Sequence, residues 1–198
     1  MLHEIIKNYD IKVVYDIGAH KGQFTKRYQK LLPNAVFYQF EANPNKKGSG
    51  NWHNIVLSHT DNVEVKFYFD GGTGDTYYRE TDEFLKSKYK TSMLTTKRLD
   101  TYILENNMPL PDLIKIDVQG AELDILKGCN DIMHHCSLIH CEIPAKGIEF
   151  NKGAPTQKEY LEFLESYGFK YKIKEKDHKR DGRIIIQHDY VFAKDPIT

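Results

Sequence analysis

The sequence has no long apolar run, no surplus of either charge and few cysteines, and each absence excludes a class of protein. No apolar stretch approaches the roughly 20 residues of a membrane-spanning helix, so we expect no membrane span. The 28 basic and 28 acidic residues cancel, which disfavours a nucleic-acid partner because nucleic-acid binders usually carry a basic surplus. The first residues lack the layout of a signal peptide, and the three cysteines form no Cys-x-x-Cys pair. We therefore expect a cytoplasmic protein.

The 198 residues do contain an alternation of apolar strand patterns and amphipathic helix patterns. No internal repeat or low-complexity linker interrupts it, so we expect a single domain over residues 1–198. The alternation predicts an α/β fold with a mostly parallel sheet and helices on both faces. The predicted strands lie at 12–17, 35–40, 54–58, 113–118, 138–143, 169–173 and 184–193. The predicted helices lie at 21–32, 99–107, 120–127 and 156–168, the last opened by a capping-box pattern.

Three further segments are harder to assign. Residues 63–69 alternate in part, which predicts either an extension of the sheet or a hairpin with the preceding strand. Residues 81–89 predict a short helix. Residues 172–183 are rich in charge and end in Asp-Gly, which favours a solvated hairpin turn. The alternative for this segment is a lip that contacts a phosphate group on an anionic acceptor.

The stretch from Val13 to Phe24 is the most informative part of the sequence, because a buried strand runs into an acid and a glycine-bearing turn. The spacing of Gly18 and Gly22 is Gly-x-x-x-Gly, which differs from the Gly-x-Gly-x-x-Gly of dinucleotide-binding folds. Asp16 at the strand end would repel a pyrophosphate and attract a cation. We therefore favour S-adenosylmethionine, whose methionine end carries an ammonium and a sulfonium. A tight turn that binds nothing is the alternative.

Two more acids stand at predicted strand ends. Glu41 follows the second strand, where an acid accepts hydrogen bonds from ribose hydroxyls; a solvated acid is the alternative. Asp117 lies at the carboxyl edge of an apolar strand, where open α/β sheets bind ligands, and Lys115 shares its face. Glu122 falls in the first turn of the next helix, where the helix dipole alone would favour it.

Four motifs follow one another along the chain: Asp16-Ile-Gly-Ala-His-Lys-Gly-Gln, Phe40-Glu41-Ala-Asn-Pro44, Leu57-Ser58 and Ile114-Lys-Ile-Asp-Val-Gln-Gly-Ala-Glu122. Together they resemble the FkbM family of S-adenosylmethionine-dependent methyltransferases, and the Lys-Ile-Asp-Val-Gln-Gly-Ala-Glu block is the most specific part. The resemblance implies a Rossmann-like class I methyltransferase fold, in which a seven-stranded, mostly parallel sheet ends in an antiparallel strand. It also implies O-methylation of a sugar, a glycan or another small molecule.

The resemblance also implies where the cofactor contacts the chain. The implied contacts are Asp16, Gly18 and Gly22 at the methionine end, Glu41 at the ribose, Leu57 and Ser58 at the adenine, and Asp117 near the methyl group. His20, also expected beside the cofactor, stands where the family pattern more often has Asn. The segment after Glu41 is too short and glycine-rich for a helical crossover, so we expect a loop there.

A hydroxyl is a poor nucleophile at neutral pH, so an O-methyltransferase needs a base. The candidates at the carboxyl edge are Asp117, Glu142 and His140, with His20 and Glu122 behind them. We favour Asp117 or Glu142. A core histidine that is hydrogen-bonded by backbone is the more usual fate of a residue such as His140.

The sequence leaves the metal content and the competing functions undecided. The cysteines and histidines of segment 129–142 match no zinc-binding spacing, and a divalent cation held by Asp117 and Glu142 is the better alternative. The competing functions are an NAD-dependent oxidoreductase, a non-catalytic cofactor-binding module and, against the neutral charge, an RNA methyltransferase. Neither the acceptor nor the oligomeric state is predicted.

Overall fold

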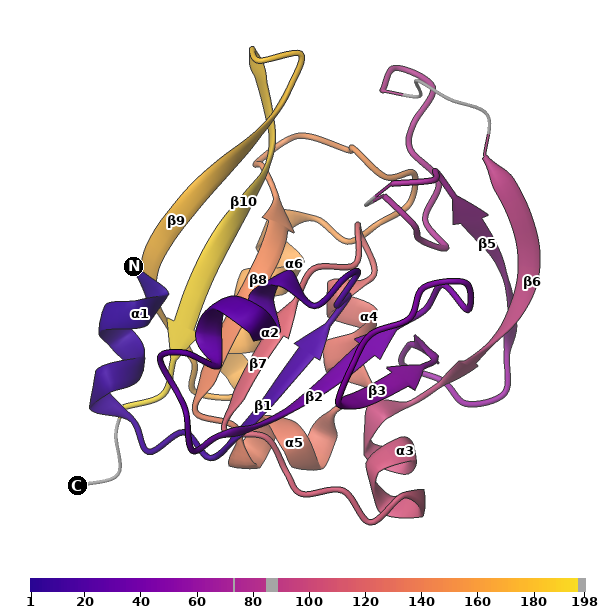
Figure 1. Cartoon of the computed structure of the whole chain (residues 1–198). Helices are drawn as coiled ribbons and strands as arrows, with labels where there is room; N and C mark the ends of the chain where they lie inside the picture. Colours follow the sequence, from indigo (N-terminus) through magenta and orange to yellow (C-terminus); the bar gives the residue numbers. More distant parts are fainter. Residues whose placement is uncertain (73, 85–88, 196–198) are drawn as a thin grey trace.

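The structure is a computed structural model that describes residues 1–72, 74–84 and 89–195 (Figure 1). The helices are α1 (Leu2–Ile5), the 3-10 helix η1 (Ile6–Asn8), α2 (Gln23–Tyr28), α3 (Leu99–Glu105), α4 (Glu122–Lys127), α5 (Asn130–His135) and α6 (Gln157–Ser166). The strands are β1 (Val13–Ile17), β2 (Val36–Glu41), β3 (Asn51–Asn54), β4 (Val56–Leu57), β5 (Glu64–Phe69), β6 (Lys90–Lys97), β7 (Leu113–Ile116), β8 (Leu138–Pro144), β9 (Lys170–Arg180) and β10 (Ile184–Ala193). Among the described residues, none of the helices has the length and apolar character needed to cross a membrane.

The larger of two sheets has seven strands in the order β3-β2-β1-β7-β8-β10-β9. The neighbours among β3, β2, β1, β7 and β8 pair in parallel. β10 runs antiparallel to both of its neighbours, β8 and β9. This topology confirms the predicted Rossmann-like class I fold, including the antiparallel last strand. The chain order reverses between β1 and β7, so ligands are expected in the crevice at the carboxyl ends of these two strands.

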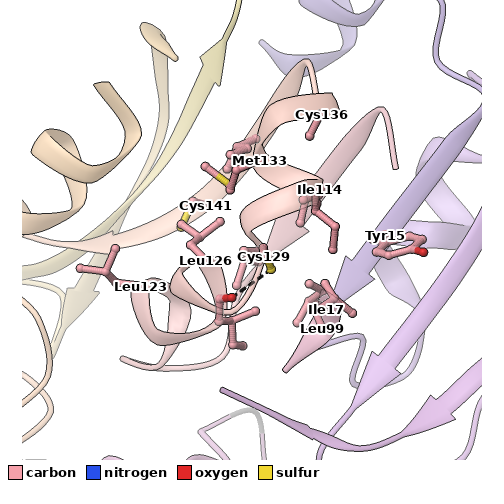
Figure 2. Close-up of a cluster of buried hydrophobic side chains, with 14 of the residues drawn as sticks. Tyr15, Ile17, Leu99, Ile114, Leu123, Leu126, Cys129, Met133, Cys136 and Cys141 are labelled. Atoms are coloured by element: carbon pink, nitrogen blue, oxygen red, sulfur yellow. Dashed lines mark hydrogen bonds between the residues drawn. The ribbon is translucent and has the colours of Figure 1, made fainter. Parts of the chain in front are cut away.

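Helices cover both faces of this sheet, but not equally (Figure 1). On one face, α3 to α6 bury a large apolar core that includes Ile116, Leu126 and Tyr160, part of which is drawn in Figure 2. On the other face, α1, η1 and α2 pack against the strands, around Leu2 and Val14. Fewer helices cover this second face, so it is more open at the carboxyl ends of the strands.

On the α1 and α2 face, the side chains change from apolar to polar within one pleat of the sheet. Val14, Leu113 and Leu138 are neighbours across β1, β7 and β8, and all three are fully buried. Same-face residues of a strand are two apart, so the next line towards the carboxyl edge lies on the same face. That next line consists of Asp16, Lys115 and His140. The apolar line packs in the core, and the polar line borders the edge at which ligands are expected.

Two predicted strands differ from the structure, because their partners are distant in the sequence. The strand predicted at 54–58 is replaced by β3, which pairs with β2, and by β4, which pairs with β6. Residues 63–69 neither extend the main sheet nor form a hairpin with the preceding strand. Instead, β5 pairs antiparallel with β6 in a separate three-stranded sheet of order β4-β6-β5. Local alternation shows that a segment is a strand but not which sheet it joins.

The charged segment 172–183 is strand rather than turn over most of its length. β9 continues to Arg180, and only residues 181–183 form the turn into β10. Its lysines do not oppose the pairing, because alternate side chains of an edge strand face solvent. The exposed lysines of β9 include Lys170, Lys172, Lys174 and Lys176. The hairpin of β9 and β10 extends past the carboxyl edge of the main sheet, opposite β5 and β6 (Figure 1).

The predicted helices at 99–107, 120–127 and 156–168 are present as α3, α4 and α6, the last with the expected capping box. The helix predicted at 21–32 is shorter, because Gly22 is in the left-handed region and α2 ends at Tyr28. Residues 81–84 contain turns and no helix, and 85–88 lie outside the described residues. The loop predicted after Glu41 is confirmed, whereas α5 was not predicted.

Two glycines give a matched test of how closely the turn after β1 packs on β7. Gly18 and Gly182 have φ of 73° and 71°, so alanine at either costs about 1 kcal/mol of left-handed strain. A Cβ at Gly18 would lie 1.9 Å from the carbonyl oxygen of Asp117, whereas one at Gly182 would meet nothing within 4 Å. We expect Gly18→Ala to lower the free energy of unfolding by about 1–3 kcal/mol more than Gly182→Ala, measured by urea denaturation. Equal losses would contradict the close packing of these two turns.

Candidate functional site

Two cavities lie side by side at the carboxyl edge of the main sheet. The first is bordered by the ends of β1 and β2, the start of the turn after β7, and residues 75–77. The second lies between α2 and the ends of β7, β8 and β10. Three of the predicted site residues line both cavities: Gly18, His20 and Asp117. The residue expected near the methyl group therefore stands at the junction of two cavities.

A buried ion pair between Asp16 and Lys115 lies beneath this junction. Asp16 is fully buried, and its Oδ1 is 3.2 Å from the Nζ of Lys115, which is 6% exposed. The same Nζ donates to the carbonyl oxygen of Gly18 at 2.9 Å and lies 3.7 Å from Oδ2 of Asp117. The Thr25 hydroxyl donates to Oδ2 of Asp16 at 2.8 Å. One ammonium group therefore connects β1, the turn after it and the end of β7.

This ion pair changes the interpretation of Asp16. Burial alone would lower the pKa of Lys115, but the carboxylates of Asp16 and Asp117 raise it above its ordinary value. Lys115 therefore stays charged and neutralises Asp16, which lines neither cavity. The argument that Asp16 draws in a cationic cofactor therefore loses its basis. Gly22 also lies off both cavities, because it packs against the side chain of Gln39 at the start of α2.

Glu41 reaches the first cavity from the end of β2. Its two carboxylate oxygens accept hydrogen bonds from the backbone N–H groups of His20 at 2.8 Å and Asn43 at 2.9 Å. These bonds fix the carboxylate at the cavity wall and hold His20 at a φ of 52°. Burial and the nearby Lys46 lower the pKa of His20, which favours a neutral imidazole between the two cavities.

The wall of the first cavity beyond Glu41 is apolar. Leu57, Phe40 and Ile125 line it, and each is buried. Ser58 does not reach the cavity, because its hydroxyl lies behind Tyr77 and accepts a hydrogen bond from the phenol at 3.3 Å. The structure therefore places one of the two residues predicted at the adenine in the cavity and the other behind its wall.

The far side of the first cavity is closed by two loops that no sequence pattern connects. The Nζ of Lys46 lies 2.7 Å from Oδ2 of Asp75, and the side-chain amide of Asn43 donates to the same oxygen at 2.7 Å. Burial opposes the charged form of Asp75, but the hydrogen bonds from Lys46 and Asn43 hold its pKa below the ordinary value. No local motif marks Asp75, since its partners lie about thirty residues earlier.

Glu122 organises the turn after β7. It accepts hydrogen bonds from the backbone N–H groups of Val118 at 2.9 Å and Gly120 at 3.0 Å, and from the Tyr160 hydroxyl at 2.9 Å. Burial raises the pKa of Glu122 to about 7 despite these three donors. Its carboxylate is therefore a structural anchor for the turn, a role more specific than compensation of the helix dipole.

Gln119 links two of the predicted catalytic carboxylates. The turn holds it at a φ of 59°, and its carbonyl oxygen accepts a hydrogen bond from the Thr76 hydroxyl at 2.9 Å. Its side-chain amide donates to Oε1 of Glu142 at 2.7 Å and to Oδ1 of Asp117 at 3.4 Å. Gln119 belongs to the most specific sequence motif, but the sequence pattern alone assigned it no role.

The other two catalytic candidates are less exposed than Asp117, and both line the second cavity. Glu142 is 3% exposed, and burial together with the charge of Asp117 raises its pKa well above the ordinary value. His140 stacks on Phe24 with ring centroids 5.9 Å apart, and its Nε2 lies 3.2 Å from Oε2 of Glu175. His140 therefore lacks the expected backbone partner: among the described residues neither ring nitrogen makes a hydrogen bond, and Nε2 has only this contact with a carboxylate.

The cysteines belong to the core rather than to a site. All three are buried, and the Sγ of Cys129 donates to the carbonyl oxygen of Ile125 at 2.9 Å (Figure 2). Burial raises the pKa of each thiol, which keeps it protonated and unsuited to binding a metal. In the part of the chain that the structure describes, segment 129–142 forms no metal-ligand cluster of its own. The zinc interpretation therefore finds no support.

Removing Lys115 should test the central ion pair. We expect Lys115→Met to lower the free energy of unfolding by about 3–5 kcal/mol, because Asp16 would stay buried without a partner. Adding Asp16→Asn to the same chain should restore part of the loss, since neither charge then remains. Urea denaturation measures both, and Lys174→Met, on the exposed side of β9, is the matched control. Strictly additive losses in the double variant would contradict the pairing.

Comparison with solved structures agrees with this fold. The chain superposes on methyltransferase FkbM from Methylobacillus flagellatus KT with a TM-score of 0.52 and 12% identity, over 91% of this chain and 43% of that one. Precorrin-6y C5,15-methyltransferase from Geobacter metallireducens GS-15 gives a TM-score of 0.50 and 14% identity, over 98% of this chain and 85% of that one. At such identities the likeness concerns the fold, which is that of class I methyltransferases.

Comparison of sequences identifies the family. The chain is 25% identical to the 2-O-methyltransferase NoeI of Sinorhizobium fredii, over 78% of this chain and 72% of that protein. The model of the methyltransferase FkbM domain matches residues 16–171, which include every motif quoted above from Asp16 to Glu122. The chain therefore belongs to the FkbM methyltransferase family.

Proposed function

We propose that this protein transfers the methyl group of S-adenosylmethionine to a hydroxyl of a sugar, a glycan or another small molecule. The observation that carries the proposal is the junction of two cavities at Asp117, because methyl transfer needs donor and acceptor to meet at one point. The family supports methyl transfer, and a relative named as a 2-O-methyltransferase supports a hydroxyl acceptor.

The first cavity fits the cofactor. The carboxylate of Glu41 is fixed at its wall by two backbone N–H groups, which leaves lone pairs on both oxygens for ribose hydroxyls. Leu57, Phe40 and Ile125 offer apolar surface to an adenine ring. The methionine end would then lie towards Gly18 and Asp117, where the second cavity begins. When bound, the cofactor supplies a methyl group already activated by its positive sulfur.

The second cavity fits a polar acceptor that also has an apolar face. Its wall combines stacked aromatic rings, Phe24 and Tyr28, with centroids 4.4 Å apart, and carboxylates that accept hydrogen bonds from hydroxyls. Asp117 is the better base of the two favoured carboxylates, because its side chain is 46% exposed and borders both cavities. Glu142 is buried and its raised pKa favours the protonated form, so it is the weaker candidate.

The cofactor assignment is tested by binding. We expect Glu41→Gln to weaken the binding of S-adenosylhomocysteine by about 10-fold or more, because the new amide N–H group would face a backbone N–H donor and the ribose hydroxyls would lose a charged acceptor. Isothermal titration calorimetry measures it, and Glu64→Gln on β5, exposed and outside the cavity, is the matched control. Equal affinities for the two variants would remove Glu41 from the cofactor site. Binding of NAD in place of S-adenosylhomocysteine by the unaltered protein would favour an oxidoreductase.

The base is tested by turnover. We expect Asp117→Asn to lower the rate of methyl transfer by about 10²–10⁴-fold while the affinity for S-adenosylhomocysteine stays near that of the unaltered protein. The measurement is transfer of a radiolabelled methyl group to a panel of mono- and oligosaccharides. If Asp117→Asn and Glu142→Gln both keep full turnover, a carboxylate base is the wrong assignment. Cofactor binding without product from any acceptor would instead indicate a non-catalytic module.

A further inference from the structure

A second group of polar side chains lies beside Glu142 and has no part in the reaction as described. Oε2 of Glu142 is 3.3 Å from Nε2 of His178, and the same nitrogen is 2.8 Å from Oδ1 of Asp189. The three ligand atoms all lie within 4.8 Å of one another. We refer to these residues as the hairpin triad, because two of them come from β9 and β10.

The sheet itself brings the hairpin triad together. Glu142 and Asp189 are direct partners across β8 and β10, so their side chains stand on the same face. His178 pairs with Gln187, two residues before Asp189, and therefore reaches the same face diagonally. A register shift between Ile185 and Gln187 marks a bulge close to this point, and bulges re-aim side chains at functional sites.

Glu142 and Asp189 place two carboxyl groups face to face in a largely buried place, and both can be charged there only beside a positive partner. Asp117 adds a third carboxylate, since the amide of Gln119 bonds both it and Glu142. The ammonium of Lys115 is already engaged with Asp16 and two carbonyl oxygens. A cation bound between Glu142, His178 and Asp189 would supply that positive partner.

We propose that Glu142, His178 and Asp189 bind a divalent transition-metal cation. Two carboxylate oxygens and one imidazole nitrogen form a mixed O/N set, which suits Mn²⁺, Fe²⁺ or Zn²⁺ better than Ca²⁺ or Mg²⁺. Three protein ligands leave coordination positions open. If the proposed function holds, an acceptor hydroxyl in the second cavity can fill one of them, and the cation would lower the pKa of that hydroxyl.

The chain contains a matched control for this site. On the opposite face of the same two strands, Nδ1 of His188 lies 2.7 Å from Oδ1 of Asp177. That pair has the same chemistry and is part of the same hairpin, but among the described residues it lacks a third ligand. His188→Gln and Asp177→Asn therefore remove a His–Asp pair of the same hairpin without touching the hairpin triad, although Asp177 also pairs with Lys174 at 3.0 Å.

The experiment is a titration of the metal-free full chain with MnCl₂, followed by the loss of the free Mn²⁺ signal in electron paramagnetic resonance. We expect one bound ion per chain, and His178→Gln or Asp189→Asn should weaken binding by at least about 10-fold. His188→Gln and Asp177→Asn should bind as the unaltered protein does. Thermal unfolding checks each variant. If His178→Gln does not fold, the CoCl₂ absorption spectrum of the unaltered protein reports instead whether nitrogen and oxygen ligands are present.

The outcomes separate this proposal from the proposed function. No binding of Mn²⁺ or Co²⁺ at millimolar concentration, or equal weakening by the His178 and His188 variants, overturns the metal site. It would leave His178 as a polar bridge between Glu142 and Asp189. Binding of S-adenosylhomocysteine is measured on the same samples. Cofactor binding and methyl transfer that persist in metal-free protein would retain the proposed function and reject the cation's part in it.

Discussion

The ion pair between Asp16 and Lys115 is the constraint on which the rest of the site depends. It lies between two parallel strands at the point where the strand order reverses, and both of its side chains are buried. A buried pair of this kind adds little net stability, but removal of one partner is costly. Its effect is geometric: the same ammonium binds the turn after β1 and approaches Asp117 at the end of β7. The junction of the two cavities is therefore fixed by one side chain.

The sequence predicted those parts of the structure that local patterns determine. Strand ends, turn glycines and the capping box at Thr156 depend on residues close to one another in the sequence. The family resemblance supplied the seven strands and the antiparallel last one. The second sheet was not predicted, because β4 and β6 pair across about forty residues. Nor was the length of β9, because charged side chains on an edge strand look like a turn when the pairing partner is unknown. Pairing over long distances is decided by packing and not by local propensity.

For the site, the residues that line the junction were predictable and the residues that support it were not. Glu41 and Asp117 stand at strand ends, where both line the first cavity. Asp16 stands in an equivalent position, yet its burial beneath Lys115 turns a predicted ligand contact into a structural one. His178 and Asp189 approach Glu142 only after three strands have assembled, so no spacing along the chain indicates them. The position of a residue along a strand thus predicts whether its side chain lies near the site. Its burial and its partners decide whether it contacts a ligand or supports the structure.

The lysines of β9 have a consequence beyond the site. A long edge strand exposes a row of unpaired backbone N–H and C=O groups and invites strands of other molecules to pair with it, which leads to aggregation. β9 is such an edge, eleven residues long, and its exposed lysines recur at every second position from Lys170 to Lys176. A second copy that approached in register would bring its own lysines opposite these, and like charges directly opposite one another destabilise a strand pair. The lysines that made this segment look like a turn in the sequence therefore oppose edge-to-edge pairing of two copies of the chain.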